Sequence, residues 1–272
     1  MLSLPLKNRI IKTELPAFVM GIVNVTPDSF FKNSRGGVER ALQLVEEGAD
    51  ILDVGAESTR PGSQYVSEEE ELSRLVPVIE KIRAESDIPI SVDTRKKNVM
   101  KAALDAGADI LNDISALEDD AEMASFCAEE KIPVILMHKK GLPVSMQDHA
   151  VSEGAFEIVN TYLKERADYA VSKGIAPEKI IVDPGIGFGK DLKANVELIK
   201  NTGNLCDKKY PILMALSRKT CIGEMTGRAV EDRLYGTLCA DILSVMKGAS
   251  MVRVHDVKET VDTLKVLRYI NS

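Results

Sequence analysis

The stretch EEGADILDVGAES, residues 46–58, decides the fold, because it joins the end of a helix, a turn and a buried strand. Gly48 can take the left-handed backbone conformation that ends a helix, which a residue with a Cβ atom resists. The apolar run that follows is typical of a strand buried on both faces, as in a parallel sheet. The same pattern returns in DAGADILNDIS (105–115) and MKGASMVRVHD (246–256), which predicts a repeated helix–turn–strand unit.

Similar units extend outward along the whole chain. Apolar runs typical of strand cores cover residues 17–26, 49–58, 88–94, 108–115, 132–138, 179–185, 211–217 and 250–256. Helical patterns cover residues 67–84, 97–106, 151–173, 195–204, 231–247 and 257–269. Strands that alternate with helices imply a parallel sheet, and about eight such units favour a closed α/β barrel, the (β/α)8 TIM barrel, over an open sheet. Residues 2–14 fall outside this count, and we expect them to form a short N-terminal β-hairpin that plugs the barrel floor.

Length and composition favour one globular domain. The chain has 272 residues, of which 44% are hydrophobic and 28% charged, and this argues against disorder. No apolar run approaches the ~20 residues of a membrane helix, and the N-terminus lacks the apolar segment of a secretory signal. The net charge of −7 offers no basic face for nucleic acid. We therefore expect a single cytoplasmic domain over residues 1–272, without a membrane or nucleic-acid partner.

The four cysteines are widely spread along the chain and form no C-x-x-C pair. Reduced cytosolic thiols are therefore expected, and neither a disulfide framework nor a zinc site. Cys221 lies near a basic motif, but no His-rich partner motif accompanies it. Helix packing is favoured there over a role as nucleophile.

Functional side chains gather at the ends of the predicted strands, where TIM-barrel enzymes hold their catalytic groups. They are Asn24, Asp28, Glu57, Thr59, Arg60, Asp93, Asn112, Asp113, His138, Asp183, Ser217, Arg218, Lys219, Arg253 and His255. Helix capping or a turn would explain a single polar strand end, and Asp28 and Asp113 suit that explanation best. A whole rim of such groups predicts a concave polar mouth.

Two kinds of group meet on this rim. Carboxylates and an amide suit a flat, N–H-rich heterocycle: Asp93, Asn112 and Asp183. Cationic or protonatable donors suit phosphate oxygens: Arg60, Lys219, Arg253 and His255. Arg253 and His255 are two residues apart, so both side chains lie on one face of a strand. The residues therefore predict a site for a neutral polar heterocycle with a phosphate-type tail.

The glycine-rich string GIGFGKD (185–191) invites comparison with nucleotide-binding loops. A Walker A loop needs glycine at 184 and Ser or Thr at 191, where this chain has Pro184 and Asp191. A Rossmann fingerprint fails as well, because Lys190 stands at its third glycine. A turn that brings backbone close to a ligand is the better account.

The strings at the strand ends resemble those of the dihydropteroate synthase family. They are VMGIVNVTPDSF (19–30), DVGAESTRPGS (53–63), SVDTRK (91–96), LNDIS (111–115), LMHKKGLPVSMQ (136–147), VDPGIGFGKD (182–191), LSRKTCIG (216–223) and VRVHD (252–256). The likeness runs in order over nearly the whole chain. STRPGS and SRK are the most specific strings, since the others recur in related pterin-binding barrels.

The resemblance implies a pterin-binding TIM barrel that makes 7,8-dihydropteroate in folate biosynthesis and is a target of sulfonamides. Its substrates would be 6-hydroxymethyl-7,8-dihydropterin pyrophosphate and p-aminobenzoate. Pyrophosphate would leave first, and the arylamine would then attack the exocyclic carbon of the pterin cation, so no protein nucleophile is needed. The resemblance also implies Mg²⁺ as cofactor and a homodimer formed through helices late in the barrel.

The resemblance further implies a role for each matching residue. The pterin would be bound by Asp93, Asn112, Asp183 and Lys219, with Met137 and Phe188 along its slot. The pyrophosphate would be bound by Arg253, His255 and Thr59, with Mg²⁺ on Asn24. Two loops that close on the pterin, residues 26–36 and 58–63, would complete the p-aminobenzoate site with Asp28, Arg60 and Pro61, and Thr220 would meet the benzoate at a helix start. The catalytic members of this set would be Asp28, Arg60, Lys219, Arg253 and His255.

The chain departs from the family pattern at three places, and three alternatives stay open. The string MHKKG (137–141) carries two lysines where the family has a more neutral pair. Ala215 stands where the family has glycine, and the first loop reads SFFKNSRGG, which puts loop closure and arylamine affinity in doubt. A pterin-dependent methyltransferase shares the pterin pocket but needs neither SRK, STRPGS nor the Arg-x-His pair. A non-catalytic pterin-binding paralogue would be expected to lose loop or metal residues. A sugar-phosphate TIM-barrel enzyme should carry an obvious base.

Overall fold

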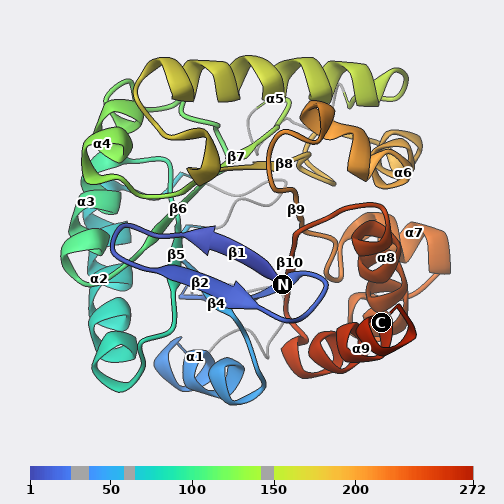
Figure 1. Cartoon of the computed structure of the whole chain (residues 1–272), viewed down its shortest axis with the longest axis horizontal. Coiled ribbons are helices and arrows are strands. Elements are labelled where there is room, and N and C mark those ends of the chain that lie inside the picture. Colours follow the sequence, from blue (N-terminus) through green and yellow to red (C-terminus); the bar gives the residue numbers. More distant parts are fainter. Residues whose placement is uncertain (26–36, 58–64, 142–149, 272) are drawn as a thin grey trace.

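The computed structural model describes residues 1–25, 37–57, 65–141 and 150–271. Eight parallel strands form one sheet in the order β8-β7-β6-β5-β4-β3-β10-β9. They are β3 (Phe18–Asn24), β4 (Ile51–Gly55), β5 (Ile90–Asp93), β6 (Ile110–Asp113), β7 (Val134–Met137), β8 (Ile180–Asp183), β9 (Leu213–Met214) and β10 (Met251–Val254). A parallel bridge between Val182 and Ile212 joins the two ends of this order and closes the sheet into a barrel. The predicted TIM barrel is thereby confirmed (Figure 1).

Helices surround the barrel and connect its strands (Figure 1). They are α1 (Gly37–Glu46), α2 (Glu68–Glu85), α3 (Lys97–Asp105), α4 (Met123–Glu130), α5 (Ala155–Ser172), α6 (Leu192–Lys200), α7 (Thr220–Thr226), α8 (Leu234–Met246) and α9 (Val257–Ile270). Short 3-10 turns lie at η2 (Pro177–Lys179), η3 (Thr202–Lys208) and η4 (Val230–Asp232). None of the helices that the structure describes combines the length and the apolar composition that a membrane span requires.

The predicted helix over residues 195–204 differs most from the observed one. Helix α6 starts earlier, because the Asp191 side chain accepts a hydrogen bond from the Ala194 backbone N–H at 2.8 Å and caps the helix. It also ends earlier, at Lys200, and a 3-10 segment follows in which Cys206 and Asp207 take left-handed backbone angles. Helices α1, α4 and α7 are not among the predicted helical patterns, although the family resemblance implies a helix start at Thr220.

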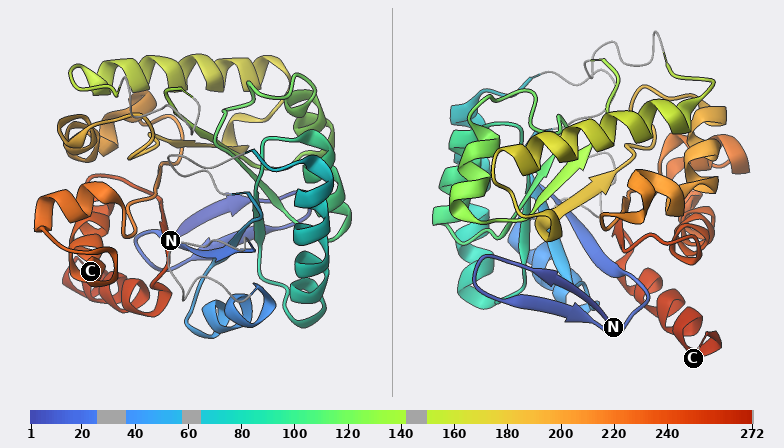
Figure 2. Two further views of the ribbon diagram at one scale, coloured as in Figure 1. Left: turned by 180° about the vertical axis from the view of Figure 1, so that it is seen from behind. Right: turned by 45° about the horizontal axis from the view of Figure 1, so that its top comes forward.

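The N-terminal residues form the expected hairpin. Strands β1 (Leu2–Pro5) and β2 (Ile10–Thr13) pair antiparallel. Leu4 and Leu6 are buried in the same apolar cluster as Phe18 and Met20 of β3, so the hairpin packs into the end of the barrel where the strands begin. Figure 2 shows it at one end of the molecule, close to both termini. The predicted plug of the barrel floor is confirmed.

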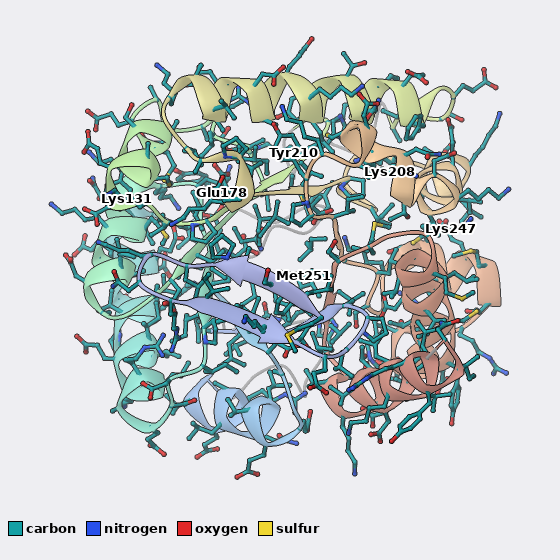
Figure 3. All side chains as sticks on the ribbon, in the orientation of Figure 1. Lys131, Glu178, Lys208, Tyr210, Lys247 and Met251 are labelled. Atoms are coloured by element: carbon teal, nitrogen blue, oxygen red, sulfur yellow. The ribbon has the colours of Figure 1, made fainter. Side chains whose placement is uncertain are left out.

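The barrel strands bury both of their faces. Residues that point outward pack under the helices in one large cluster, which includes Val19, Leu52 and Val252. Residues that point inward form a second, smaller cluster with the hairpin. Met251, which is 1% exposed, belongs to this inner cluster and lies near the centre of the view in Figure 3. Burial on both faces explains why the strand runs in the sequence are continuously apolar and do not alternate.

Candidate active site

Along β4, β6, β8 and β10, the barrel interior changes from apolar to polar within two residues. At the hairpin end, a first inner layer consists of Ile51, Ser91, Ile110, Ile135, Ile181, Leu213 and Met251. Because side chains alternate along a strand, the next inward positions lie two residues further on. This second inner layer consists of Asp53, Asp93, Asn112, Met137, Asp183, Ala215 and Arg253. It lies at the carboxyl ends of the strands, where TIM-barrel enzymes place their active sites.

The strand register brings members of the second inner layer side by side. Asp93 of β5 is paired with Asn112 of β6, and Met137 of β7 is paired with Asp183 of β8. Asp93, Asn112 and Asp183, which the sequence assigns to a flat heterocycle, thus line one wall of the barrel interior together with Met137. Arg253 reaches them from β10, since its Nη2 lies 3.4 Å from Asp93 Oδ2.

Asp53 is a member of this layer that sequence reasoning missed. Its side chain is 0% exposed, and its Oδ2 accepts a hydrogen bond from Arg253 Nε at 2.6 Å. The Asn112 amide Nδ2 also donates to Asp53, at 3.1 Å from Oδ2 and 3.3 Å from Oδ1. The alternation could have revealed it, because Asp53 stands two residues after Ile51 just as Asn112 stands two after Ile110.

Asp183 and Lys219 carry opposite charges at the wall that Asp93, Asn112, Met137 and Asp183 line. Burial raises the pKa of Asp183, and the Lys219 ammonium opposes that shift. Burial lowers the pKa of Lys219 to about 8, and the Asp183 carboxylate opposes this in turn. Lys219 Nζ donates to the Ile186 carbonyl at 2.5 Å and lies 4.9 Å from the centre of the Phe188 ring. Lys219 thus adjoins the aromatic ring that the sequence placed along the same slot.

His255 is held from two sides at the end of β10. The Ser217 hydroxyl lies 2.9 Å from His255 Nδ1 and accepts the His255 backbone N–H at 3.1 Å. Arg40 of α1 donates to the His255 carbonyl at 2.7 Å. The contact between Nδ1 and Ser217 fixes the orientation of the His255 ring.

Arg218 of the SRK string has a structural role. It is 5% exposed, and its guanidinium forms a bidentate pair with Asp256, at 2.8 Å from Nε to Oδ2 and 2.9 Å from Nη2 to Oδ1. Its backbone φ of 55° lies in the left-handed region, which turns the chain between β9 and α7. The next two residues are thereby placed at the start of α7, where Thr220 is exposed as its first residue.

The glycine-rich turn after β8 is wrapped around a buried ammonium. Lys190 is 3% exposed, and its Nζ donates to the carbonyls of Gly185 at 2.7 Å, Phe188 at 3.0 Å and His138 at 3.2 Å. A Cβ atom at Gly185 would lie 1.9 Å from the His138 carbonyl oxygen, so only glycine fits. The turn places the Ile186 carbonyl against Lys219, and the close approach of its backbone to a ligand stays a prediction.

Other polar strand ends are structural. The Asp113 carboxylate accepts the backbone N–H groups of Ser115 at 2.7 Å and Leu117 at 2.8 Å, which confirms its role in a turn. Burial lowers the pKa of His138 to about 3, and its ring packs edge-on against Tyr162. Glu57 is held in a buried network of ion pairs with Arg95 and Lys96.

Asn24 ends β3 beside Gly55 of β4, on the inward face of the barrel. Within the described residues, no group of three or more His, Cys, Asp or Glu side chains could hold a metal ion. Mg²⁺ keeps several waters and is commonly bound through one or two protein oxygens together with substrate phosphates. The amide oxygen of Asn24 therefore fits an ion that arrives with a phosphate group.

Four predicted site residues lie outside the described residues: Asp28, Thr59, Arg60 and Pro61. The two loops assigned to residues 26–36 and 58–63 lie outside them as well. The described members of the predicted set are Asn24, Asp93, Asn112, Met137, Asp183, Phe188, Lys219, Thr220, Arg253 and His255. All ten lie at or beyond the carboxyl ends of the barrel strands.

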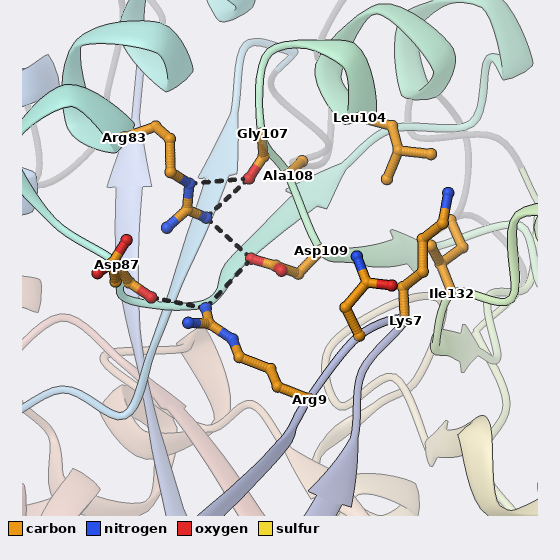
Figure 4. A pocket seen from close by; sticks show the side chains of 10 residues that line it. Lys7, Arg9, Arg83, Asp87, Leu104, Gly107, Ala108, Asp109 and Ile132 are labelled. Atoms are coloured by element: carbon orange, nitrogen blue, oxygen red, sulfur yellow. Dashed lines mark hydrogen bonds and ion pairs between the residues drawn. The ribbon is translucent and has the colours of Figure 1, made fainter.

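A hollow of about 390 Å³ opens at the opposite end of the barrel, beside the hairpin turn (Figure 4). Charged side chains that line this hollow form ion pairs and hydrogen bonds with neighbouring protein groups. Arg83 pairs with Asp109 at 2.9 Å, and Arg9 donates to the Asp87 carbonyl at 2.6 Å. Arg9 also lies 4.0 Å from Asp109, so it ties the hairpin turn to the loops that precede β5 and β6.

Comparisons with known proteins agree with this geometry. A family model described as a pterin binding enzyme matches residues 20–255. The dihydropteroate synthase of Neisseria meningitidis serogroup B is 44% identical over 259 residues, which cover 91% of this chain and 90% of that protein.

Solved structures show the same likeness. Xanthomonas albilineans dihydropteroate synthase in complex with 7,8-dihydropteroate is similar with a TM-score of 0.87 and 39% identity, covering 100% of this chain and 99% of that one. Yersinia pestis dihydropteroate synthase in a sulfonamide drug complex is similar with a TM-score of 0.92 and 35% identity, covering 99% of both chains.

Proposed function

The chain belongs to the dihydropteroate synthase family, and we propose how the residues of its barrel mouth divide the work of that family's reaction. The enzyme condenses 6-hydroxymethyl-7,8-dihydropterin pyrophosphate with p-aminobenzoate and yields 7,8-dihydropteroate and pyrophosphate. One observation above all supports the division: Asp93, Asn112, Asp183 and Arg253 converge in one inner layer at the carboxyl ends of the strands.

The pterin ring is proposed to lie against the wall formed by β5 to β8. Asp183 and Asn112 offer oxygens for the ring N–H groups, and Asp93 lies beside them. Met137 and Phe188 supply the apolar faces of the slot. Lys219, next to both Asp183 and the Phe188 ring, donates to the ring's acceptor atoms.

The pyrophosphate is proposed to lie above β10. The Arg253 guanidinium has five N–H donors, of which Asp53 and Asp93 take two, so it can hold phosphate oxygens while it stays anchored. His255 follows two residues after Arg253 and is assigned to the same phosphate oxygens, as is Thr59. Mg²⁺, held by Asn24 and the pyrophosphate, would neutralise charge on the leaving oxygens.

The p-aminobenzoate is proposed to enter beside Asp28, Arg60 and Pro61, with its carboxylate near Thr220 at the start of α7. Pyrophosphate departs from the pterin methylene as Arg253 and His255 stabilise the leaving charge. The carboxyl groups of Asp93 and Asp183 then stabilise the positive pterin. The arylamine nitrogen attacks the exocyclic carbon and loses a proton, which completes the C–N bond.

Pyrophosphate release with and without p-aminobenzoate tests the assignment. We expect release that depends on the arylamine and is matched by 7,8-dihydropteroate. A pterin-dependent methyltransferase or a non-catalytic binding protein would give no such product. Chelation with EDTA should stop release and added Mg²⁺ should restore it. Turnover indifferent to both treatments would contradict the role of Asn24 and the metal.

We further propose that residues 1–272 act as one cytoplasmic domain. All four cysteines are free, and Cys127, Cys206 and Cys221 are buried. Free thiols suit the reducing conditions of a cytosol.

We also propose a homodimer formed through the last helices. Tyr235, Leu243 and Met246 of α8 are 82%, 46% and 65% exposed, and their spacing places them on one side of that helix. Val266 and Ile270 of α9 add exposed apolar surface next to it. An apolar patch of this kind marks an interface, and a second copy of the chain is the partner that the family suggests.

A further inference from the structure

Two residues that are assigned to different parts of the pterin pyrophosphate both donate to one carboxylate, which is assigned to neither part. Arg253, proposed for the pyrophosphate, and Asn112, proposed for the pterin, both donate to Asp53. Asp53 itself is 0% exposed and lies in the middle of β4, between the apolar first inner layer and the mouth. Since it is completely covered by protein, its effect on a ligand must pass through the groups that it holds.

We infer that Asp53 is a positioning residue, which aims the guanidinium of Arg253 at the pyrophosphate and the amide oxygen of Asn112 at the pterin. This inference rests on the proposed function of the mouth. Asp53 is not among the residues that are proposed to touch the substrate.

The distances show which carboxylate holds the guanidinium. Arg253 Nε lies 2.6 Å from Asp53 Oδ2, whereas Arg253 Nη2 lies 3.4 Å from Asp93 Oδ2. A charge-assisted hydrogen bond is strong at the shorter distance and weak at the longer one. Asp53 therefore anchors Arg253 and leaves Asp93 available to the pterin. Without Asp53, the guanidinium would turn toward Asp93 and take up the carboxyl that the substrate needs.

The same carboxylate fixes which end of the Asn112 amide faces the ligand. With Nδ2 donating to Asp53, the amide oxygen is the atom turned toward the mouth. A buried carboxylate can accept hydrogen bonds but cannot donate them, so the reversed amide would set two acceptors against each other. Asn112 consequently offers an acceptor to a ring N–H of the pterin.

The charge of Asp53 also acts on Asp93. Burial raises the pKa of Asp93 above its usual range, and the negative charge of Asp53 raises it further. Glu71 of α2 and Glu57 after β4 act in the same direction, and Arg253 of β10 opposes them. Loss of the Asp53 charge should therefore lower the pKa of Asp93, a change that a purely structural role would not produce.

The test replaces Asp53 by its neutral isostere, Asp53→Asn. We expect kcat/KM for the pterin pyrophosphate to fall about tenfold or more, because the anchored guanidinium loses its charged partner. The KM for p-aminobenzoate should stay within about twofold. The inflection of the pH profile that reports Asp93 should move to lower pH.

Asp50→Asn is the matched control. Asp50 stands just before β4, and its carboxylate accepts the Val19 N–H at the hairpin end. We therefore expect kcat/KM of this variant to stay near that of the wild type.

A double-mutant cycle with Arg253→Met gives the decisive outcome. If Asp53 acts through Arg253, the double variant loses less than the product of the two single losses. The inference is overturned if the loss in kcat/KM of the double variant equals the product of the two single losses. It is also overturned if Asp53→Asn has the rates and the pH profile of the wild type. Failure of the proposed function is seen separately, as absence of arylamine-dependent product from the wild-type enzyme.

Asp93→Asn provides a second route should Asp53→Asn not fold. Because Asp53 anchors Arg253, this variant should bind inorganic pyrophosphate in the presence of Mg²⁺ within about threefold of wild type. A loss of pyrophosphate affinity as large as that of Arg253→Met would show that Asp93 is the anchor, and would refute the inference.

Discussion

At the scale of single residues, Asp241 is a buried carboxyl that the proposed chemistry does not use. It lies on α8, is 2% exposed, and neither of its oxygens has a hydrogen-bond partner within the described part of the chain. Burial raises the pKa of Asp241 well above its usual value, and the neighbouring charge of Asp256 acts in the same direction. The native protein therefore keeps a proton here at pH values where the unfolded chain has released it.

Asp241→Asn should make the stability less dependent on pH. With a raised native pKa, the wild type is favoured at low pH and loses stability as the pH rises above about 4, the value at which an unfolded Asp ionises. The amide does not ionise, so we expect the variant to be about 1–3 kcal/mol more stable at pH 8. Urea unfolding at pH 5 and pH 8 measures the slope. Asp262→Asn, at a side chain that is 65% exposed, is the control, and an equal slope in both variants would refute the account.

Polar residues that follow an apolar run were predicted, whereas the acid inside such a run was missed. Asp93, Asn112 and Asp183 each follow an apolar run, so the change from apolar to polar marks them in the sequence. Asp53 stands within the run Ile51–Gly55, where a lone acid is easily taken for part of a turn. Its partner Arg253 lies 200 residues away in sequence, and no local pattern reports such a contact.

At the scale of elements, the turn between β8 and α6 owes its shape to Lys190. The ammonium has three N–H donors, and the structure gives it three carbonyl acceptors. Asn195 of α6 supports the same turn, since its Oδ1 accepts the Gly187 N–H at 2.8 Å. The turn in this shape presents the Ile186 carbonyl and the Phe188 ring to Lys219.

Lys190→Met should damage both stability and pterin binding. The methionine fills the space but leaves three carbonyls without their donor, at a cost of about 2–4 kcal/mol. A relaxed turn displaces the Phe188 ring, so KM for the pterin pyrophosphate should rise about tenfold. Lys193→Met, at a side chain that is 66% exposed, is the matched control three residues further on. Equal KM values for the two variants would show that the turn does not position the site.

Element types were easier to predict than element ends. The eight strands follow from apolar runs, three of them after glycine turns, and the hairpin was expected because residues 2–14 fall outside the repeat. The predicted helix from 151 began too early, because Val151 forms a bridge with Lys190 and α5 starts only at Ala155. That bridge connects two loops, and loop pairing leaves no periodic signal in the sequence.

The hairpin should contribute to stability without contributing to catalysis. Leu4 is 2% exposed and packs against the first inner layer, so Leu4→Ala should lower the free energy of unfolding by about 2–4 kcal/mol. Both KM values should be unchanged at temperatures where the protein is folded, because the mouth lies at the other end of the strands. Chemical denaturation and steady-state kinetics measure the two effects. Ile10→Ala, at a side chain that is 62% exposed, should cost less than about 0.5 kcal/mol.

At the scale of the whole molecule, the barrel separates its functions by position. The hairpin and the hollow beside it occupy the end where strands begin, and the polar second inner layer occupies the end where they finish. Helices α8 and α9 lie to one side of both ends (Figure 1). An interface on these helices would therefore leave the mouth open to substrate.

Because α8 and α9 lie away from the barrel mouth, the proposed homodimer can be tested with variants that leave the active site intact. Leu243→Glu puts a charge in the middle of the exposed apolar side of α8, and desolvating that charge on association is costly. We expect the wild type to sediment as a dimer at about 10 μM, a concentration that saturates stable interfaces, and the variant to sediment as a monomer. Ile158→Glu on α5 is the matched control, because Ile158 is 47% exposed against 46% for Leu243, and it should stay dimeric. A monomeric wild type, or a control that dissociates while Leu243→Glu does not, would place the interface elsewhere or remove it. Since neither residue touches the second inner layer, pterin binding by the monomer would further show that each barrel carries a complete pterin pocket.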